Sequence, residues 1–176
     1  VKKPKEILEI GTAVAFSAGL MCRYIQPEGH VTTIDRYELM LAEAEKNVKR
    51  LGLEDKITII RGDAAEVLKK LEGPYDFVFL DAAKGQYIQF LPDILRLMPI
   101  GGVFVADDVL QGGNIAKSRF TLPRRQRTIH KRMRNFLWDI SHLDCLESSI
   151  IPIGDGIVFC TKIKEYIPEE GEFSDD

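Results

Sequence analysis

Short apolar runs alternate along this chain with longer segments in which apolar residues recur every three or four positions. The short runs are typical of buried β-strands, and we predict five of them at residues 6–10, 31–34, 57–60, 75–80 and 103–106. The periodic segments predict helices at residues 17–25, 37–51 and 87–98, with a short helix that ends near residue 71. Strands that alternate with helices in this way predict a parallel sheet with right-handed crossovers.

The C-terminal part of the chain departs from this alternation. After a basic helix over residues 124–140, two apolar runs at 145–151 and 157–163 are separated only by residues 152–156. So short a link permits a hairpin and excludes a parallel crossover. We therefore predict an α/β fold with a mostly parallel seven-stranded sheet, a C-terminal antiparallel hairpin and helices on both faces.

Length and composition fit one domain, which we place at residues 1–167, followed by an acidic tail at 168–176. The chain has 176 residues, of which 45% are hydrophobic, enough for one buried core. It enters its first strand almost directly after Val1, so we expect that an N-terminal segment is missing. The three cysteines lie far apart without C-x-x-C spacing, which favours a reducing cytoplasm, and no apolar run is long enough to span a membrane.

A net charge of −3 conceals one strongly basic segment. Residues 109–138 contain eight Lys or Arg residues and no Asp or Glu. Exposed basic helices are commonly just solvated, but so much segregated charge favours an anionic partner. RNA phosphates and the phosphates of an acyl-CoA both satisfy this requirement. For RNA contact we single out Arg119, Arg124, Arg125, Arg127 and Lys131.

The predicted parallel strands end in acidic or small residues, at the edge where open α/β sheets bind ligands. Each acid alone is more often a helix cap, but five aligned strand ends favour one site. In the first turn, Ala13 and Ala15 stand where a dinucleotide pyrophosphate needs glycine. Asp35 follows Gly11 by 24 residues, near the spacing of an acid that binds ribose hydroxyls. These features favour an adenosine cofactor without phosphates over a nicotinamide dinucleotide.

Six segments together carry a resemblance to a known family. In chain order they are EIGTAVAFSAG, TIDRYELMLAEAEKNVKRLGLEDKI, RGDAAEVL, FVFLDAAKGQY, GGVFVADDVL and SIIPIGDGIVFC. They resemble the class I S-adenosylmethionine (SAM) methyltransferases of the catechol and caffeoyl-CoA O-methyltransferase type, over about residues 5 to 163. Within this group, RRQRTIHKRMRNFL is most similar to the bacterial tRNA 5-hydroxyuridine methyltransferase branch. The resemblance implies a Rossmann-like fold, SAM and Mg²⁺ as cofactors, and a homodimer.

The resemblance also implies roles for individual residues. Around the methionine part of SAM it places Glu9, Gly11, Ala13 and Ser17. Along the ribose, the adenine and the reacting end it places Asp35, Asp63, Ala64 and Asp81. The implied ligands of a divalent metal are Asp81, Asp107 and Asp108. Lys84 would lie beside the acceptor hydroxyl and, with Asp81, make up the catalytic pair; the alternative for Lys84 is a surface lysine paired with a carboxylate.

Two residues depart from the family pattern. Ala15 replaces the second glycine of the first turn, which crowds that turn if the position needs a positive φ. Asp108 stands where the third metal ligand is commonly Asn. Three carboxylates still form a hard oxygen site suited to Mg²⁺.

The chemistry leaves three functions to separate. Methyl transfer from a sulfonium needs an oxygen held in line with the S–methyl bond, and a metal that chelates two adjacent oxygens fixes that geometry. The 5-hydroxyl and 4-carbonyl of hydroxyuridine provide such a pair, as does a catechol. We therefore predict a SAM-dependent and Mg²⁺-dependent methyltransferase of tRNA 5-hydroxyuridine. The alternatives are a small-molecule catechol or caffeoyl-CoA-like O-methyltransferase and a non-catalytic nucleic-acid-binding or SAM-binding module.

Overall fold

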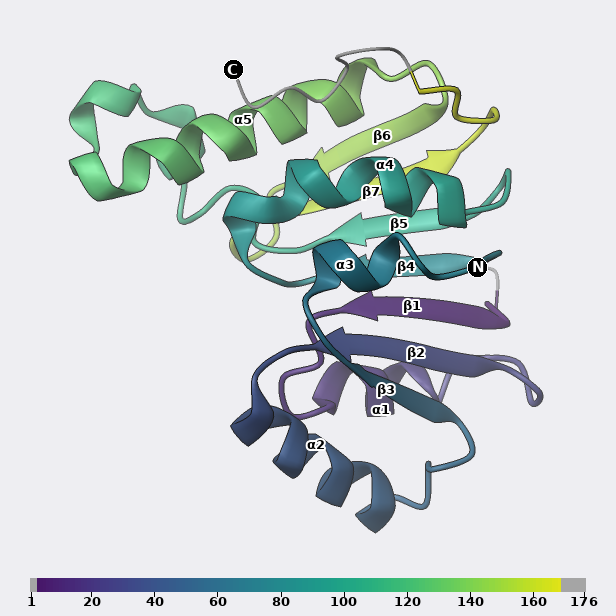
Figure 1. Cartoon of the computed structure of the whole chain (residues 1–176). Coiled ribbons are helices and arrows are strands. Elements are labelled where there is room, and N and C mark those ends of the chain that lie inside the picture. Colours follow the sequence, from purple (N-terminus) through teal and green to yellow (C-terminus); the bar gives the residue numbers. More distant parts are fainter. Residues whose placement is uncertain (1–2, 169–176) are drawn as a thin grey trace.

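The structure is a computed structural model that describes residues 3–168. This part of the chain contains one seven-stranded sheet with the order β3–β2–β1–β4–β5–β7–β6 (Figure 1). The strands are β1 Glu6–Ile10, β2 His30–Asp35, β3 Ile57–Arg61, β4 Phe77–Leu80, β5 Val103–Ala106, β6 Leu146–Ile151 and β7 Ile157–Lys162. Residues 169–176 of the predicted acidic tail lie outside the described residues.

The strand directions confirm the predicted hairpin. Strands β1 to β5 pair in parallel, whereas β7 runs antiparallel to both β5 and β6. The register of the hairpin runs from Leu146 opposite Lys162 to Ile151 opposite Ile157. Because β7 lies between β5 and β6, the hairpin extends the sheet and β6 forms its edge. Only β7 opposes the other strands of the sheet.

The helices follow the predicted order, with two corrections at their ends. The α-helices are α1 Phe16–Met21, α2 Glu38–Arg50, α3 Ala64–Leu68, α4 Tyr87–Leu97 and α5 Arg127–His142. Helix α1 ends before the predicted residue 25, because the amides after it bond three residues back, Tyr24 to Met21 O at 2.9 Å. Helix α5 begins after the predicted residue 124, because Arg124–Gln126 form a separate 3₁₀ turn.

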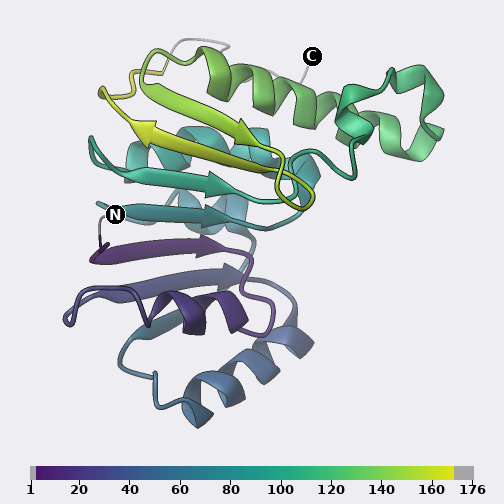
Figure 2. The same cartoon turned by 180° about the vertical axis from the view of Figure 1, so that it is seen from behind.

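Two apolar cores lie on opposite faces of the sheet. Buried side chains of α3, α4 and α5 pack with strands β4, β5 and β7 in the larger core. Buried side chains of α1 and α2 pack with β1, β2 and β3 in the smaller one. Figure 2 shows α1 in front of the sheet, on the face opposite α4. The predicted arrangement of helices on both faces is therefore confirmed.

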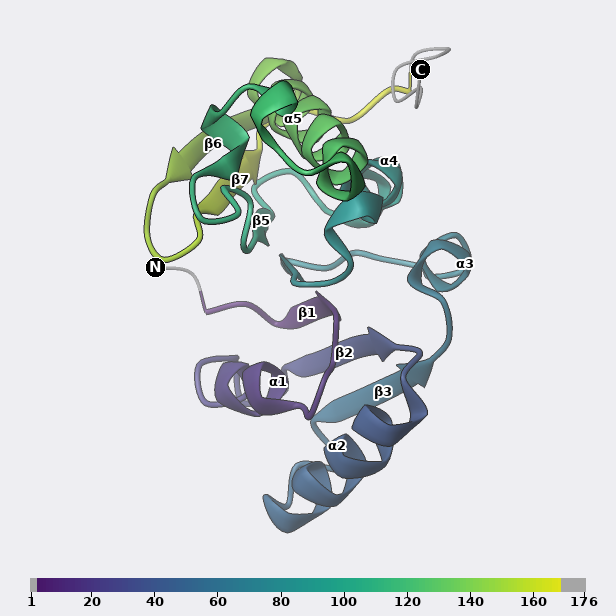
Figure 3. The same cartoon turned by 90° about the vertical axis from the view of Figure 1, so that its left-hand side faces the viewer.

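The carboxyl ends of the parallel strands meet at one edge of the sheet, where ligands bind in such folds. This edge faces the viewer in Figure 3. Here the chain order reverses, because β1 lies between β2 and β4. The start of α5 and the short turns before it project beyond the same edge (Figure 1). Within residues 3–168, no helix is long and apolar enough to cross a membrane.

Candidate active site

The turn after β1 passes so close to β4 that only glycine fits at position 11. The φ angle of Gly11 is 111°, and a Cβ there would lie 2.0 Å from the backbone oxygen of Asp81. The amides of Gly11 and Thr12 both donate to the carbonyl of Ile34, at 2.9 and 3.3 Å. The turn is therefore fixed against both neighbouring strands, and the first turn and Asp81 adjoin one another.

Asp35, at the end of β2, is held by three backbone amides. Its Oδ2 accepts from the amide of Ala13 at 2.9 Å, and its Oδ1 accepts from those of Arg36 and Tyr37 at 2.7 and 3.0 Å. These bonds fix the carboxylate without using every lone pair, since each oxygen can accept two hydrogen bonds. Asp35 is thus oriented in advance to accept a ribose hydroxyl.

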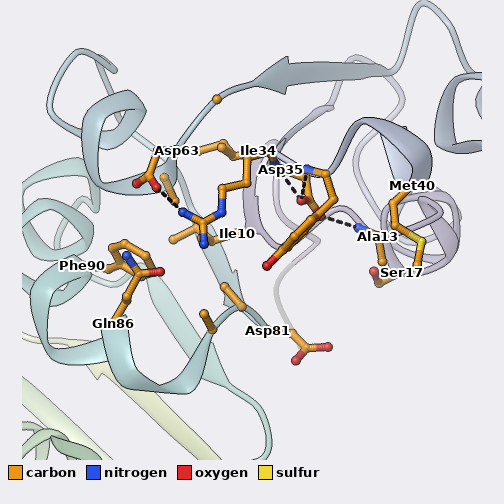
Figure 4. A pocket seen from close by; sticks show the side chains of 17 residues that line it. Ile10, Ala13, Ser17, Ile34, Asp35, Met40, Asp63, Asp81, Gln86 and Phe90 are labelled. Atoms are coloured by element: carbon orange, nitrogen blue, oxygen red, sulfur yellow. Dashed lines mark hydrogen bonds and ion pairs between the residues drawn. The ribbon is translucent and has the colours of Figure 1, made fainter. Parts of the chain in front are cut away.

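A cavity of about 370 Å³ opens between these elements. Figure 4 shows Asp35 and Asp63 along one side of it and Asp81 across from them. The sequence-predicted cofactor residues that line it are Gly11, Ala13, Ser17, Asp35, Asp63, Ala64 and Asp81. Apolar side chains complete the wall, namely Ile10, Ile34, Met40 and Phe90. An apolar cavity with convergent carboxylates fits the adenosine and methionine parts of SAM.

Glu9 was predicted to contact the cofactor, but it does not line this cavity. Its side chain is fully buried, and it accepts a hydrogen bond from the hydroxyl of Thr33 at 2.5 Å. Burial raises the pKa of Glu9 to about 7, against the lowering effect of the hydroxyls of Ser17 and Thr33. Because Ser17 does line the cavity, Glu9 supports the site from inside the protein.

Ala15 has the positive φ angle that we expected to crowd the first turn. Its φ is 61° and its ψ is 30°, and its side chain is buried in the smaller core. A non-glycine residue in this region costs about 1–2 kcal/mol. The amide of Ala15 still donates to the carbonyl of Thr12 at 2.8 Å, and Ala15 is absent from the cavity wall. The replacement thus strains the turn without filling the cavity.

Arg36 is a residue of the cavity that the sequence analysis missed. It follows Asp35 directly, and its guanidinium donates to Asp63 Oδ2 at 2.6 Å. The other oxygen of Asp63 accepts from the amide of Ala65 at 3.0 Å, capping α3. Both side chains are partly exposed, so solvent screens this ion pair and it stabilises the fold only weakly. An adenine amino group that bonded Asp63 would share it with Arg36 or displace this weak pair.

Lys84 lies among the acids at the ends of β4 and β5. Its ammonium donates to Asp108 Oδ2 and lies 3.7 Å from Asp81 Oδ1. Burial raises the pKa of Asp81, and the charges of Asp107 and Asp108 raise it further, while Lys84 lowers it. The structure therefore shows the carboxylate pairing that was the alternative for Lys84, at the position predicted for a catalytic lysine.

The three predicted metal ligands do not form a ready metal centre. Within residues 3–168 there is no cluster of three His, Cys, Asp or Glu residues arranged to hold an ion. The Lys84 ammonium pairs with Asp81 and Asp108, and Asp107 Oδ1 accepts from the Asp108 amide at 2.7 Å. The donor chemistry suits a hard cation, but the side-chain arrangement suits an ammonium. The φ of Asp108 is 58°, a conformation that Asn and Asp tolerate better than most other non-glycine residues.

A second cavity, of about 500 Å³, adjoins Lys84. Both it and the first cavity have Ala83 in their walls. Its apolar residues are Leu122 and Ile129, and its polar ones, besides Lys84 and Asp108, are Gln111, Asn114, Gln126 and Asp155. Sequence reasoning did not find the three amides, because they belong to irregular turns without a spacing signal. Its place beside Lys84 makes this cavity the candidate acceptor site.

The predicted RNA-binding residues divide into two groups. Arg119, Arg127 and Lys131 line a third cavity, of about 270 Å³, together with Arg132. Arg124 and Arg125 lie in the 3₁₀ turn before α5 and are exposed. The basic segment thus adjoins the acceptor cavity, to whose wall it contributes Leu122, Gln126 and Ile129.

Comparisons with known proteins agree with this geometry. A model of the O-methyltransferase family matches residues 1–163. A caffeoyl-CoA O-methyltransferase from Stellaria longipes is 29% identical over 174 residues, covering 92% of this chain and 69% of the relative. A catechol O-methyltransferase from Niastella koreensis is 34% identical over 126 residues, covering 69% of this chain and 57% of the relative. The structure of a methyltransferase from Podospora anserina with S-adenosylhomocysteine (SAH) bound matches with a TM-score of 0.82 at 25% identity, covering 92% of this chain and 73% of the other.

Proposed function

Because the chain belongs to the O-methyltransferase family, we propose that it transfers the methyl group of SAM to the 5-hydroxyl of hydroxyuridine in a tRNA. The family and its use of SAM agree with the sequence prediction, and the tRNA acceptor is the part that we add. The observation that supports it is the basic segment beside the acceptor cavity, where Arg127 and Arg132 bond the carbonyls of Leu122 and Gly85, because its side chains can contact phosphates.

The acceptor cavity suits a nucleobase as well as a phenol. The side chains of Gln111, Asn114 and Gln126 each offer one carbonyl acceptor and two N–H donors. A uracil ring carries both carbonyl acceptors and an N–H donor, so amides can satisfy it in the plane of the ring. Leu122 and Ile129 provide the apolar faces that a flat ring packs against.

The reaction itself requires alignment and a place for one proton. The acceptor oxygen forms its bond to the methyl carbon as the sulfonium sulfur keeps the electron pair of the broken bond, which leaves SAH. The cofactor cavity and the acceptor cavity meet at Ala83, so the two reactants face one another. The hydroxyl proton passes to the amine of Lys84, which must first separate from Asp108 to act as the base.

We include Mg²⁺ in the proposal on the basis of the donor set alone. A divalent cation would be held by Asp81, Asp107 and Asp108, where it would stabilise negative charge on the acceptor oxygen. Lys84 would then have to leave Asp108. Treatment with a chelator followed by Mg²⁺ should abolish and then restore methyl transfer, and transfer that persists without divalent ions would contradict this part.

The main experiment is methyl transfer from labelled SAM to tRNA that carries 5-hydroxyuridine. We expect incorporation of one methyl group per modified base, identified as 5-methoxyuridine by nucleoside mass spectrometry. The variant Asp81→Ala should lose it, while Asp144→Ala, an exposed acid far from the cavity residues in the sequence, should not. Failure with correctly modified tRNA, in a sample that binds SAH, would disprove the tRNA acceptor.

A small phenol is the second candidate, favoured by the names of the relatives with caffeoyl-CoA and catechol substrates. Free catechols should then be methylated at rates that do not change when Arg124, Arg125 and Arg127 are reversed to Glu. A non-catalytic module should show no transfer to any acceptor, and calorimetry with SAH separates a module that binds cofactor from one that does not.

A further inference from the structure

We infer that the third cavity binds a phosphate of the nucleotide next to the acceptor base, and that Phe120 stacks on that nucleotide's base. This inference rests on the proposed function and specifies how the substrate is held. The cavity, which we call the phosphate subsite, has a volume of about 270 Å³. Its walls are Arg119, Arg127, Thr128, Lys131, Arg132 and Asn135. Every one of these side chains can donate a hydrogen bond to a phosphate oxygen.

Three cations of this subsite differ from cations that are already paired with carboxylates. Arg61, for example, pairs with both Glu38 and Glu45. By contrast, no carboxylate of residues 3–168 forms an ion pair with Arg119, Arg127 or Lys131. Charges gathered in one cavity repel each other unless an anion neutralises them. The charge is therefore available for a ligand.

The position of these charges on α5 costs stability. Arg127 begins this 16-residue helix, and Arg124 and Arg125 form the turn before it. No acid lies in its first turn, and no side chain caps its first amides. Positive charge at the positive end of a helix dipole is unfavourable by roughly 0.3–1 kcal/mol per residue. A bound anion such as phosphate, however, is stabilised at this same end of a helix.

The phosphate subsite and the acceptor cavity share a wall. Arg127 Nε donates to the carbonyl of Leu122 at 3.1 Å, and Arg132 Nη1 donates to the carbonyl of Gly85 at 3.3 Å. Leu122 and Gly85 both line the acceptor cavity. Two residues of the subsite thus bond the backbone of the cavity that holds the base. The two cavities are therefore neighbours, as a base and an adjacent phosphate are in a nucleic-acid strand.

Phe120 provides the second part of the contact. Its side chain is 71% exposed, and the guanidinium carbons of Arg119 and Arg127 lie 5.0 and 5.9 Å from its ring centre. An exposed aromatic ring beside phosphate-binding cations is the usual arrangement for single-stranded nucleic acids, where bases stack on the ring. An exposed phenylalanine beside two arginines therefore favours a flanking nucleotide over a bare phosphate.

The test compares three acceptors that differ only in what flanks the base. They are 5-hydroxyuridine, its 3′,5′-bisphosphate, and an RNA hairpin with 5-hydroxyuridine in the loop. For wild-type protein, kcat/KM for the bisphosphate should exceed that for the nucleoside by roughly tenfold or more, as charge-assisted hydrogen bonds to phosphate predict. In the double variant Arg127→Gln/Lys131→Gln this ratio should fall to about one. Arg127 also donates to the backbone carbonyls of Leu122 and Phe120, so its loss can disturb the fold locally. The single variant Lys131→Gln keeps these hydrogen bonds and should give an intermediate ratio of kcat/KM for the bisphosphate to that for the nucleoside.

The matched control is Lys117→Gln/Arg134→Gln, which removes the same charge from the same basic segment outside the subsite. This control should keep the ratio. Phe120→Ala should lower kcat/KM for the hairpin about tenfold and leave the ratio of bisphosphate to nucleoside unchanged. Thermal unfolding and SAH affinity of each variant verify that the fold and the cofactor site persist.

The outcomes separate the two proposals. If all three uridine acceptors are methylated equally well, or if both double variants lower the ratio equally, the phosphate subsite is wrong and the proposed function stands. If no uridine derivative is methylated while free catechol is, the proposed function fails and the subsite fails with it. A ratio that falls only in the subsite variants supports both.

Discussion

The cofactor half and the acceptor half of the site are built by different means. Around the cofactor cavity, backbone atoms fix the functional groups. The carboxylate of Asp35 accepts hydrogen bonds from three backbone amides, and Gly11 lies so close to the backbone of Asp81 that no side chain fits between them. Around the acceptor cavity, side chains pair with side chains, as Lys84 does with Asp108, and irregular turns carry the polar groups. Backbone contacts are rigid, whereas the acceptor half can exchange its partners.

This difference matches what each half must do. The proposed cofactor is the same whichever acceptor is methylated, so a cavity fixed by backbone geometry serves any acceptor. Acceptors differ between relatives, and a site formed from exposed side chains and short turns can change its substrate without changing the fold. Variants that change one half of the site test this distinction when their effect on the other half is measured.

The largest effect is expected from Gly11→Ala. Its Cβ would lie 2.0 Å from a backbone oxygen that cannot move without moving β4. We expect a loss of about 3 kcal/mol or more in the free energy of unfolding, and loss of SAH binding. Gly52→Ala is the control, because Gly52 has a φ of 64° with open space around it and should cost only about 1 kcal/mol. Equal losses in the two variants, measured by urea unfolding, would show that the close approach is unimportant.

Lys84→Met and Asp35→Ala should affect different steps. Lys84 does not line the cofactor cavity, so its loss should lower kcat roughly 10²–10⁴-fold with little change in SAH affinity. Asp35→Ala should instead weaken SAH binding about tenfold or more, because a charged acceptor is removed from a cavity built around it. Calorimetry with SAH and single-turnover methyl transfer measure the two quantities. If Lys84→Met lost SAH binding to the same extent, the division into two halves would be wrong.

Glu9 gives a prediction about pH. Its pKa in the folded protein, about 7, lies above its ordinary value of 4.5, so the folded state binds the proton more tightly. The contribution of Glu9 to stability is therefore fully present below pH 4.5 and is lost as pH rises to 7, by roughly 3 kcal/mol. Glu9→Gln should flatten this decline. Urea unfolding of both proteins at pH 5 and pH 8 measures it, and parallel pH profiles would refute the assignment.

Ala15→Gly should stabilise the protein by about 1 kcal/mol, because glycine adopts a φ of 61° without strain. Ala18→Gly is the matched control, since Ala18 is buried two positions into the regular part of the same helix and should lose about 1 kcal/mol. The melting temperature should therefore rise in Ala15→Gly and fall in Ala18→Gly, relative to the wild-type protein. A loss of stability in both would mean that the buried methyl group of Ala15 outweighs its strain.

The smallest effect is expected at the start of α5. Arg125→Glu replaces a positive charge by a negative one at the positive end of the helix and should raise the free energy of unfolding by about 0.5 kcal/mol. Lys3→Glu, which makes the same charge change in the exposed segment before β1, should have no such effect. This variant tests whether the positive charges at the start of α5, which are proposed to bind the substrate, lower the stability of the fold. If both variants changed the free energy of unfolding equally, the effect would come from the net charge of the protein and not from the helix dipole.

The alternation of apolar runs and periodic segments was enough to predict the fold. Strand direction follows from local pattern and from connection length: the five residues between the last two strands permit only a hairpin, and the structure has one. The order of the strands in the sheet was not predicted and comes from the structure. The acids at the strand ends were also placed by pattern, because carboxyl ends of parallel strands meet at one edge. The family prediction is confirmed by the family model, while the tRNA branch, the homodimer and the cytoplasmic location stay predictions.

What the sequence determined about this protein is therefore the sheet, the edge that carries the site and the kind of chemistry found there. Only the tertiary structure decided which side chains meet. In the structure, Glu9 is buried outside the cavity and Lys84 pairs with Asp108. Arg119 and Lys131, which are 12 residues apart, line the same subsite. Periodicity records which face of an element is buried. Contacts between residues far apart in the chain depend instead on turn geometry and side-chain rotamers, which leave no repeating signal in the sequence.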